Sequence, residues 1–151
     1  MKCLSVSQPY ADLIVQGKKT IELRTWNTKY RGEFLIHAPS KIKKDACKKL
    51  GIDETKIRTG VIIGKAEIYD VKIYDSVSEL KSDYKKHFST EEFLRHKYGF
   101  LLKNLRELKI PIPYKGSLGF FNVNLDTKVK ESDIKSELFD EEWRYQFIGR
   151  H

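Results

Sequence analysis

This 151-residue chain is best interpreted from the segment Gly17-Lys18-Lys19-Thr20-Ile21-Glu22-Leu23-Arg24-Thr25-Trp26. Gly17 suits the end of a short helix, because glycine readily adopts the left-handed backbone found there. The residues after it alternate as in a β-strand, so Ile21 and Leu23 are expected to face the core. Lys18 and Lys19 at the helix exit, with Glu22, Arg24 and Trp26 on the other face of the strand, then form an outward-facing ledge. Such a ledge suits a nucleotide, since cations bind phosphate, a carboxylate accepts from base amino groups, and an indole stacks on a base.

The sequence before and after this segment predicts further strands and a helix. A strand at residues 3–6 precedes a helix that begins at Ser7-Gln8-Pro9, where the serine hydroxyl is expected to cap it. Residues 20–26 and 33–38 are expected to pair as the two strands of one hairpin. The fold class predicted from these elements is α+β.

The rest of the chain continues this pattern. A lysine-rich amphipathic helix is expected at residues 41–50, and its lysines suit either a solvated surface or a phosphate backbone. Gly64 lies within a long β-rich stretch and indicates a bend or bulge that curves a barrel strand. The remaining expected elements are two helical pieces in residues 76–98 that separate near Ser89, a strand at residues 98–102, an extended proline loop at residues 110–116, and a last strand at residues 118–123.

Composition indicates the class of partner. The chain has 29 Lys and Arg against 21 Asp and Glu, a net charge of +8 that attracts anions such as nucleic acid. Cys3 and Cys47 form no CxxC pair, so neither a disulfide framework nor a zinc-finger spacing is visible, and no metal or cofactor is expected. No apolar run approaches membrane-spanning length. We therefore expect a cytoplasmic protein that does not bind membranes.

Several short motifs, in order along the chain, carry a resemblance to a known family. They are Ser5-Val6-Ser7-Gln8-Pro9-Tyr10-Ala11, residues 17–24, Tyr30-Arg31-Gly32, Ile36-His37-Ala38 and Tyr114-Lys115-Gly116-Ser117-Leu118-Gly119-Phe120-Phe121-Asn122-Val123. Together they resemble the ASCH domain, the activating-signal-cointegrator homology domain, over residues 1–125. The resemblance implies a small β-barrel similar to the PUA fold, with flanking helices.

The resemblance also implies nucleic-acid binding, with RNA as the expected partner and DNA or a free nucleotide left open. Arg31 lies in a turn, where the resemblance favours a role facing the ligand. Lys65 and Lys115 are further candidates whose direction the sequence leaves open. The candidate binding residues are Lys18, Lys19, Arg24, Trp26, Arg31, Lys65 and Lys115.

A hydrolase is the alternative function. Some short bacterial relatives are 4-acetylcytidine amidohydrolases that use a lysine, a threonine three positions later and a distant glutamate. Lys19 matches that lysine, but Glu22 occupies the threonine position, so the nucleophilic hydroxyl is missing. The catalytic set would then be Lys19 with Glu22 or Glu67, which would activate a water to cleave a modified nucleoside or, as a ribonuclease, RNA.

The same residues also have structural alternatives. Lys19 and Arg24 are able to pair with Glu22, in which case the charges stabilise the fold rather than bind a ligand. Trp26 suits packing on the core as well as stacking on a base. His37 is expected to be a hydrogen-bonded histidine rather than a base.

Residues 126–151 are expected to form a helical extension of the domain at residues 1–125. Two apolar rows, one through Leu138 and one through Trp143, follow helical spacing. Burying one such aromatic residue is worth about 1.5–3 kcal/mol, so the extension is expected to pack on the domain. Packing on a second subunit is the alternative, which leaves a monomer or a weak dimer open. It also leaves a protein-interaction module as the third function.

Overall fold

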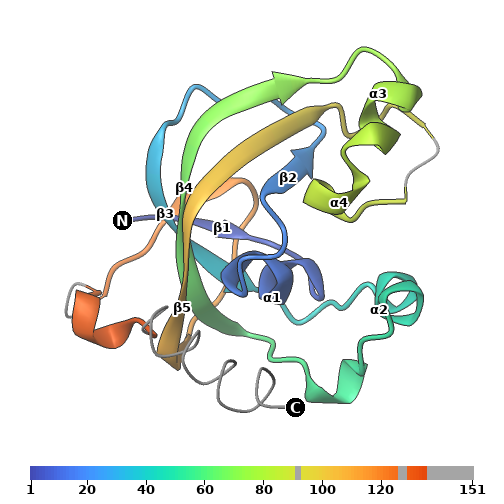
Figure 1. The fold of residues 1–151 in the computed structure, drawn as a ribbon. Helices are drawn as coiled ribbons and strands as arrows, with labels where there is room; N and C mark the ends of the chain where they lie inside the picture. The colour runs from blue at the N-terminus through green and yellow to red at the C-terminus, as the bar shows by residue number, and fades with distance from the viewer. Residues whose placement is uncertain (91–92, 126–128, 136–151) are drawn as a thin grey trace, which may run out of the picture.

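The computed structural model describes residues 1–90, 93–125 and 129–135. Within these residues one six-stranded sheet, in the order β2-β5-β4-β3-β1-β6, curls into a half-open barrel with short helices around it (Figure 1). The α+β class is therefore confirmed. The strands are β1 (Lys2–Ser5), β2 (Ile21–Arg24), β3 (Gly32–Ala38), β4 (Val61–Ile73), β5 (Tyr98–Pro113) and β6 (Phe120–Asn122). The helices are α1 (Tyr10–Val15), α2 (Lys44–Leu50), α3 (Val77–Ser82) and α4 (Tyr84–His87), with 3-10 turns η1 (Glu54–Lys56) and η2 (Glu131–Asp133).

The partner of strand β2 differs from the prediction. β2 pairs antiparallel with β5, from Ile21 opposite Leu101 to Arg24 opposite Tyr98. The expected partner, β3, pairs parallel with β1 and antiparallel with β4, so both of its edges are occupied. The predicted hairpin of β2 with β3 is therefore wrong. As a result, β2 lies at one edge of the sheet.

The curvature of the sheet is concentrated in the two long strands β4 and β5. Their pairing changes register between Ile62 and Gly64. At Gly64 a Cβ atom would lie 2.3 Å from the carbonyl oxygen of Arg106 and 2.4 Å from Cγ1 of Val15. The predicted irregularity at Gly64 is confirmed, and the missing side chain lets helix α1 approach the curved sheet closely.

The main core lies between the sheet and helix α1. It includes Ile14 of α1 and Phe100 of β5, both fully buried. Trp26, just beyond β2, packs edge-to-face on Phe100 and Phe120, with ring centroids 5.2 and 5.8 Å apart. This packing fixes the end of β2 and, with it, the backbone position of Arg24.

Strand β5 continues to Pro113, where the sequence predicts a loop. Pro113 pairs with Val61 of β4. Proline has no N–H to donate, but β2 pairs with β5 only as far as Leu101 and Ile134 bridges Leu108, so beyond Leu108 this edge of β5 is free of partner strands among the described residues. Pro111 and Pro113 are tolerated because they lie on that free edge.

Helix α1 forms where it is predicted, but it starts differently. The N–H of Tyr10 donates to the backbone carbonyl of Ser7 at 3.0 Å, and no side chain caps the helix, so the predicted serine cap is wrong. Gly17 follows the helix with a φ of 80°, which confirms the predicted left-handed stop. The chain turns there into the segment that carries Lys19.

The region after β4 holds two helices, but both lie in the first of the two predicted helical pieces. α3 and α4 meet at Asp83, and residues 93–97, in the second predicted piece, form bends and turns, so the predicted helix there is wrong. The Asp83 carboxylate accepts the hydroxyl of Tyr74 at 2.7 Å, which holds this junction against the end of β4. The N–H of Thr20 donates to the carbonyl oxygen of Lys86 at 2.9 Å. Helix α4 therefore stands directly beside the start of β2.

Only the beginning of the predicted C-terminal extension belongs to the described residues. Ile134 is buried and forms a bridge with Leu108 of β5. The N–H of Lys135 donates to the carbonyl oxygen of Glu107 at 2.8 Å. These first residues pack on the barrel. The helix expected further on, at residues 136–151, lies outside the described residues, and the domain boundary at residue 125 stays a prediction.

Candidate nucleic-acid interface

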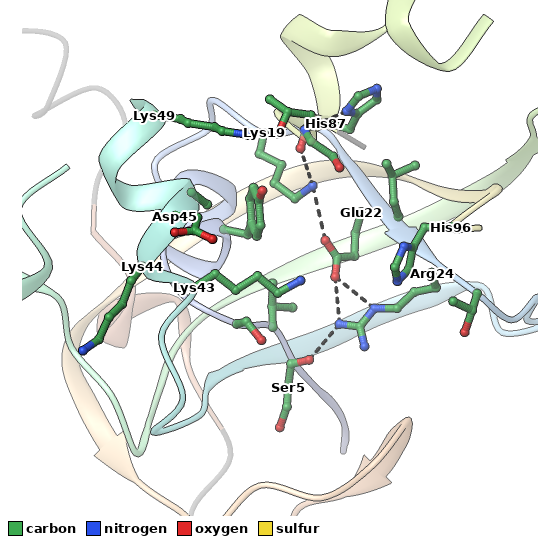
Figure 2. Close-up of a pocket in the computed structure, with 18 of the residues that line it drawn as sticks. Ser5, Lys19, Glu22, Arg24, Lys43, Lys44, Asp45, Lys49, His87 and His96 are labelled. Atoms are coloured by element: carbon green, nitrogen blue, oxygen red, sulfur yellow. Dashed lines mark hydrogen bonds and ion pairs between the residues drawn. The ribbon is translucent and has the colours of Figure 1, made fainter. Parts of the chain in front are cut away.

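A pocket of about 540 Å³ opens between β2 and helices α1, α2 and α4; we call it the central pocket. Lys19, Glu22 and Arg24 line it (Figure 2), and Trp26 also belongs to its lining. The structure thus brings four side chains of the predicted ledge to one site. Their outward exposure is wrong for two of them, because Lys19 is only 2% exposed and Glu22 only 7%.

The burial of Glu22 follows from the covering of β2 on both faces. Ile21 and Leu23 pack on Tyr74 and Leu80, on the side of α3. The other face of β2 borders the central pocket, whose walls come from α1, α2 and α4. A simple alternation of buried and exposed residues therefore does not apply to this strand.

Lys19 ties β2 to helix α4. Its ammonium group donates to the carbonyl oxygens of Ile21 at 2.6 Å and His87 at 2.8 Å, and it lies 3.3 Å from Oε1 of Glu22. These partners use the three N–H bonds of the ammonium group. Burial lowers the pKa of Lys19, and the negative charge of Glu22 opposes that shift. Lys19 is therefore an anchored cation at the floor of the central pocket.

Glu22 lies between two cations. Its Oε1 faces the ammonium group of Lys19, and its Oε2 accepts from Nε of Arg24 at 2.9 Å. Burial raises the pKa of Glu22, but the charges of Arg24 and Lys19 together outweigh it, so the pKa stays below its ordinary value. Glu22 is consequently a carboxylate at neutral pH, and its charge is compensated within the protein.

Arg24 is held on one side only. Besides the bond from Nε, its Nη2 lies 2.8 Å from Oε2 of Glu22 and donates to the carbonyl oxygen of Ser5 at 2.7 Å. Among the described residues, Nη1 has no hydrogen-bond partner, and Figure 2 shows it turned away from Glu22. The side chain is 20% exposed. The guanidinium group is thus fixed in place while the two N–H bonds of Nη1 remain available to a ligand.

Lys43, which precedes α2, and lysines of α2 form the wall of the central pocket opposite β2. Lys43 points into the pocket towards Arg24, whereas Lys44 points away from it (Figure 2). Lys49 donates to Oγ1 of Thr90 at 3.1 Å, which links α2 to the segment after α4. In all, five Lys and Arg side chains and two carboxylates line the pocket. The lining of the pocket therefore carries more positive than negative side chains.

The structure places the other predicted binding residues away from this pocket. Lys18 is exposed and does not line it. Arg31 and Lys65 each pair with a carboxylate outside the pocket, at 3.6 and 3.4 Å. Lys115 is exposed beside a second pocket, which is described below.

Glu67 and His37 also lie outside the central pocket. Glu67 lies 3.5 Å from the ammonium group of Lys103, on the β4–β5 pair. His37 is buried, with Nδ1 2.9 Å from Oγ of Ser5 and Nε2 2.7 Å from the carbonyl oxygen of Tyr114. The prediction that His37 is a hydrogen-bonded histidine is confirmed.

The sequence did not reveal several residues that complete the central pocket. Tyr10, His87 and His96 belong to elements whose positions beside β2 depend on the tertiary fold. The lysine-rich pattern around α2 was the available signal, but the same pattern is typical of a solvated helix. Only the position of α2 across from β2 distinguishes the two.

Metal binding, thiol chemistry and membrane insertion find little support in the described residues. Among the described residues, no group of three or more His, Cys, Asp and Glu side chains could hold a metal ion. Burial raises the pKa of Cys3 to about 12, so its thiol is a poor nucleophile at neutral pH. In the described parts of the chain, no helix has the length and apolar character needed to cross a membrane.

Comparison with known proteins finds curated relatives. The family model of the ASCH domain matches residues 4–114. Activating signal cointegrator 1 of Homo sapiens is 27% identical over 147 residues, covering 88% of this chain and 24% of the relative. The protein of the same name from Mus musculus is 27% identical over 145 residues, with the same coverage. The chain thus spans about a quarter of the length of these relatives.

Solved structures have the same fold. The crystal structure of ASCH from Zymomonas mobilis matches with a TM-score of 0.57 and 19% sequence identity, covering 87% of this chain and 89% of that one. A tyrosine-to-phenylalanine variant of that protein gives a TM-score of 0.58 and 20% identity, covering 82% and 89%. The predicted PUA-like barrel with flanking helices is therefore confirmed. Since the family model covers most of its length, this chain belongs to the ASCH domain family.

Proposed function

We propose that this chain binds single-stranded RNA in the central pocket, with Arg24 as the contact to a phosphate group. The observation that carries the proposal is the restraint on Arg24. Glu22 and the carbonyl oxygen of Ser5 hold one side of the guanidinium group, and the N–H bonds of Nη1 are left for a ligand. A guanidinium held in this way suits phosphate, because it loses little conformational freedom when it binds.

The charge balance of the central pocket supports an anionic ligand. The charge of Glu22 is compensated by Lys19 and Arg24, so it repels a phosphate only weakly. Lys43 points into the pocket from the opposite wall. A strand that crosses the pocket would therefore have cations on both sides of its backbone, as sequence-independent binding of single strands requires.

Trp26 supplies an aromatic surface for a base. Trp26 belongs to the lining of the pocket, and its ring is held by edge-to-face contacts with Phe100 and Phe120. A base stacked on such a ring contributes about 1–3 kcal/mol and requires no particular base. In this proposal Trp26 contacts the base and Arg24 the phosphate, while Lys19 and Glu22 are positioning residues.

Replacement of Arg24 tests the proposal. Arg24→Gln is expected to weaken the binding of a short labelled single-stranded RNA by about tenfold or more, because charge-assisted hydrogen bonds are worth about 1.5–3 kcal/mol. Fluorescence anisotropy titrations at fixed salt measure this effect. Lys103→Gln is the matched control, because it removes the same charge from an exposed site outside the pocket.

A common loss of about twofold in both variants would contradict the proposal, because it would indicate only a diffuse effect of net charge. Unlabelled DNA of the same sequence serves as a competitor in this assay. Competition equal to that of RNA would place recognition in the phosphates and bases rather than in the 2′-hydroxyl.

The hydrolase alternative is expected to fail. The ammonium group of Lys19 is fully engaged, Glu22 has a lowered pKa that makes it a weak base, and Glu67 does not line the pocket. Incubation with 4-acetylcytidine is therefore expected to release no cytidine, and labelled RNA is expected to stay intact. Product release that Glu22→Gln abolishes, in a variant shown to be folded, would overturn this prediction.

A further inference from the structure

A second pocket, of about 730 Å³, adjoins the central pocket. Its wall is the loop at residues 114–119, so we call it the loop pocket. Ser5, Ser7 and Arg24 line both pockets. Arg24 therefore lies at the boundary between two hollows, each large enough for a ligand the size of a nucleotide.

The loop pocket also favours an anion. Arg24, Lys41 and Lys115 line it, and no Asp or Glu of the described residues does. The central pocket, in contrast, includes two carboxylates. An anionic chain would therefore meet cations in the loop pocket without an opposing charge.

The loop that forms this wall is held closely against the barrel. A Cβ atom at Gly116 would lie 2.6 Å from both Oγ of Ser5 and Cε1 of His37. The ring of His37 is in turn bonded to Ser5 and to the carbonyl oxygen of Tyr114. Because the carbonyl oxygen of Ser5 accepts from Arg24, these contacts hold the loop and Arg24 close to each other.

We propose that the two pockets are adjoining subsites for consecutive nucleotides of one RNA strand, with the phosphate that links them bound at Nη1 of Arg24. This inference rests on the proposed function and specifies its ligand as a strand of at least two nucleotides. A free nucleoside has no phosphate for Arg24 and fills only one of the two hollows. Lys41 and Lys115 then bind the backbone on the side of the loop pocket.

Short ligands of increasing length test the proposal with the intact chain. Calorimetric titrations compare uridine 3′- and 5′-monophosphates with the dinucleotide UpU. UpU is expected to bind about tenfold more tightly than either mononucleotide, because only it reaches both pockets. In the variant Lys41→Ala/Lys115→Ala this tenfold advantage of UpU over the mononucleotides is expected to disappear.

The variant Lys81→Ala/Lys103→Ala is the matched control, because it removes two lysines that line neither pocket. It is expected to keep the preference for UpU. Equal affinities for UpU and a mononucleotide, both weakened by Arg24→Gln, would overturn the two-subsite inference and leave the proposed function standing. If Arg24→Gln changes the affinity of neither UpU nor the mononucleotides, both the two-subsite inference and the proposed function are overturned.

Discussion

Replacing Glu22 with glutamine is expected to lower the free energy of unfolding by about 3–5 kcal/mol, because it leaves buried cations without their carboxylate. Lys19 is 2% exposed and lies 3.3 Å from Glu22, and Arg24 bonds to the other carboxylate oxygen. The amide of glutamine keeps the shape of the side chain but removes its charge. Urea unfolding at neutral pH, followed by circular dichroism, measures the change.

The control for this prediction is Glu33→Gln. Glu33 pairs with Lys65 at 3.4 Å, but its side chain is 52% exposed, and such surface pairs contribute about 0–1 kcal/mol. Adding Lys19→Met to Glu22→Gln is expected to restore part of the lost stability, because the unpaired buried charge is then removed. A Glu22→Gln variant as stable as Glu33→Gln would contradict the idea of a buried charge network.

The same network predicts a pH dependence. The pKa of Glu22 is lower in the folded chain than its ordinary value of 4.5. Its contribution to stability is therefore complete above about pH 4.5 and is lost as the pH falls through the folded pKa. Unfolding measured from pH 7 down to pH 3 should show a smaller loss of stability for Glu22→Gln than for the unmodified chain.

Replacing Gly64 with alanine is expected to destabilise the fold by about 3 kcal/mol or more, or to prevent folding. The added Cβ would lie 2.3 Å from the carbonyl oxygen of Arg106 and 2.4 Å from Val15, so β5 and α1 would both have to move. Because one obstacle is backbone, a change of side-chain rotamer cannot relieve it. Thermal unfolding and the yield of soluble protein measure the effect.

Ile73→Ala on the same strand is the control for Gly64→Ala, because Ile73 is about half exposed. It is expected to change stability by about 1 kcal/mol or less. A Gly64→Ala variant that unfolds at the same temperature as Ile73→Ala would mean that the fold does not require the close approach of α1 to β4. The curvature of the barrel would then need another explanation.

The sequence predicted those features that depend on local geometry. Gly17 and Gly64 were identified from their places in a helix exit and a strand, and both positions require the absence of a side chain or a positive φ. The alternation after Gly17 also identified a strand, predicted at residues 20–26 and observed at Ile21–Arg24. The ASCH resemblance supplied the barrel, which composition and periodicity alone do not specify.

Features that depend on distant contacts were predicted poorly. Glu22 was expected to face outward, because nothing near it in the sequence shows that helices from two other regions enclose that face of β2. β2 was paired with the next strand along the chain, whereas its partner begins at Tyr98. The free edge that allows Pro111 within a strand results from the same long-range pairing.

The candidate site shows the same contrast between features set by local sequence and features set by distant contacts. Lys19, Glu22, Arg24 and Trp26 come from one segment and were found together in the sequence. The cation across the pocket, Lys43, comes from a separate helical region whose position only the fold determines. The structure also distinguishes the parts of the segment, because Lys19 is enclosed while Arg24 has N–H bonds left for a ligand.

The most direct test of the central claim, that Arg24 binds a phosphate, is a thermodynamic cycle between Arg24→Gln and neutral methylphosphonate linkages in a short single-stranded RNA. Neutral linkages are expected to weaken binding to the unmodified chain by about tenfold more than binding to Arg24→Gln, whereas Lys103→Gln should behave like the unmodified chain. Equal losses in all three proteins would mean that Arg24 and the phosphates act independently, which would contradict the claim.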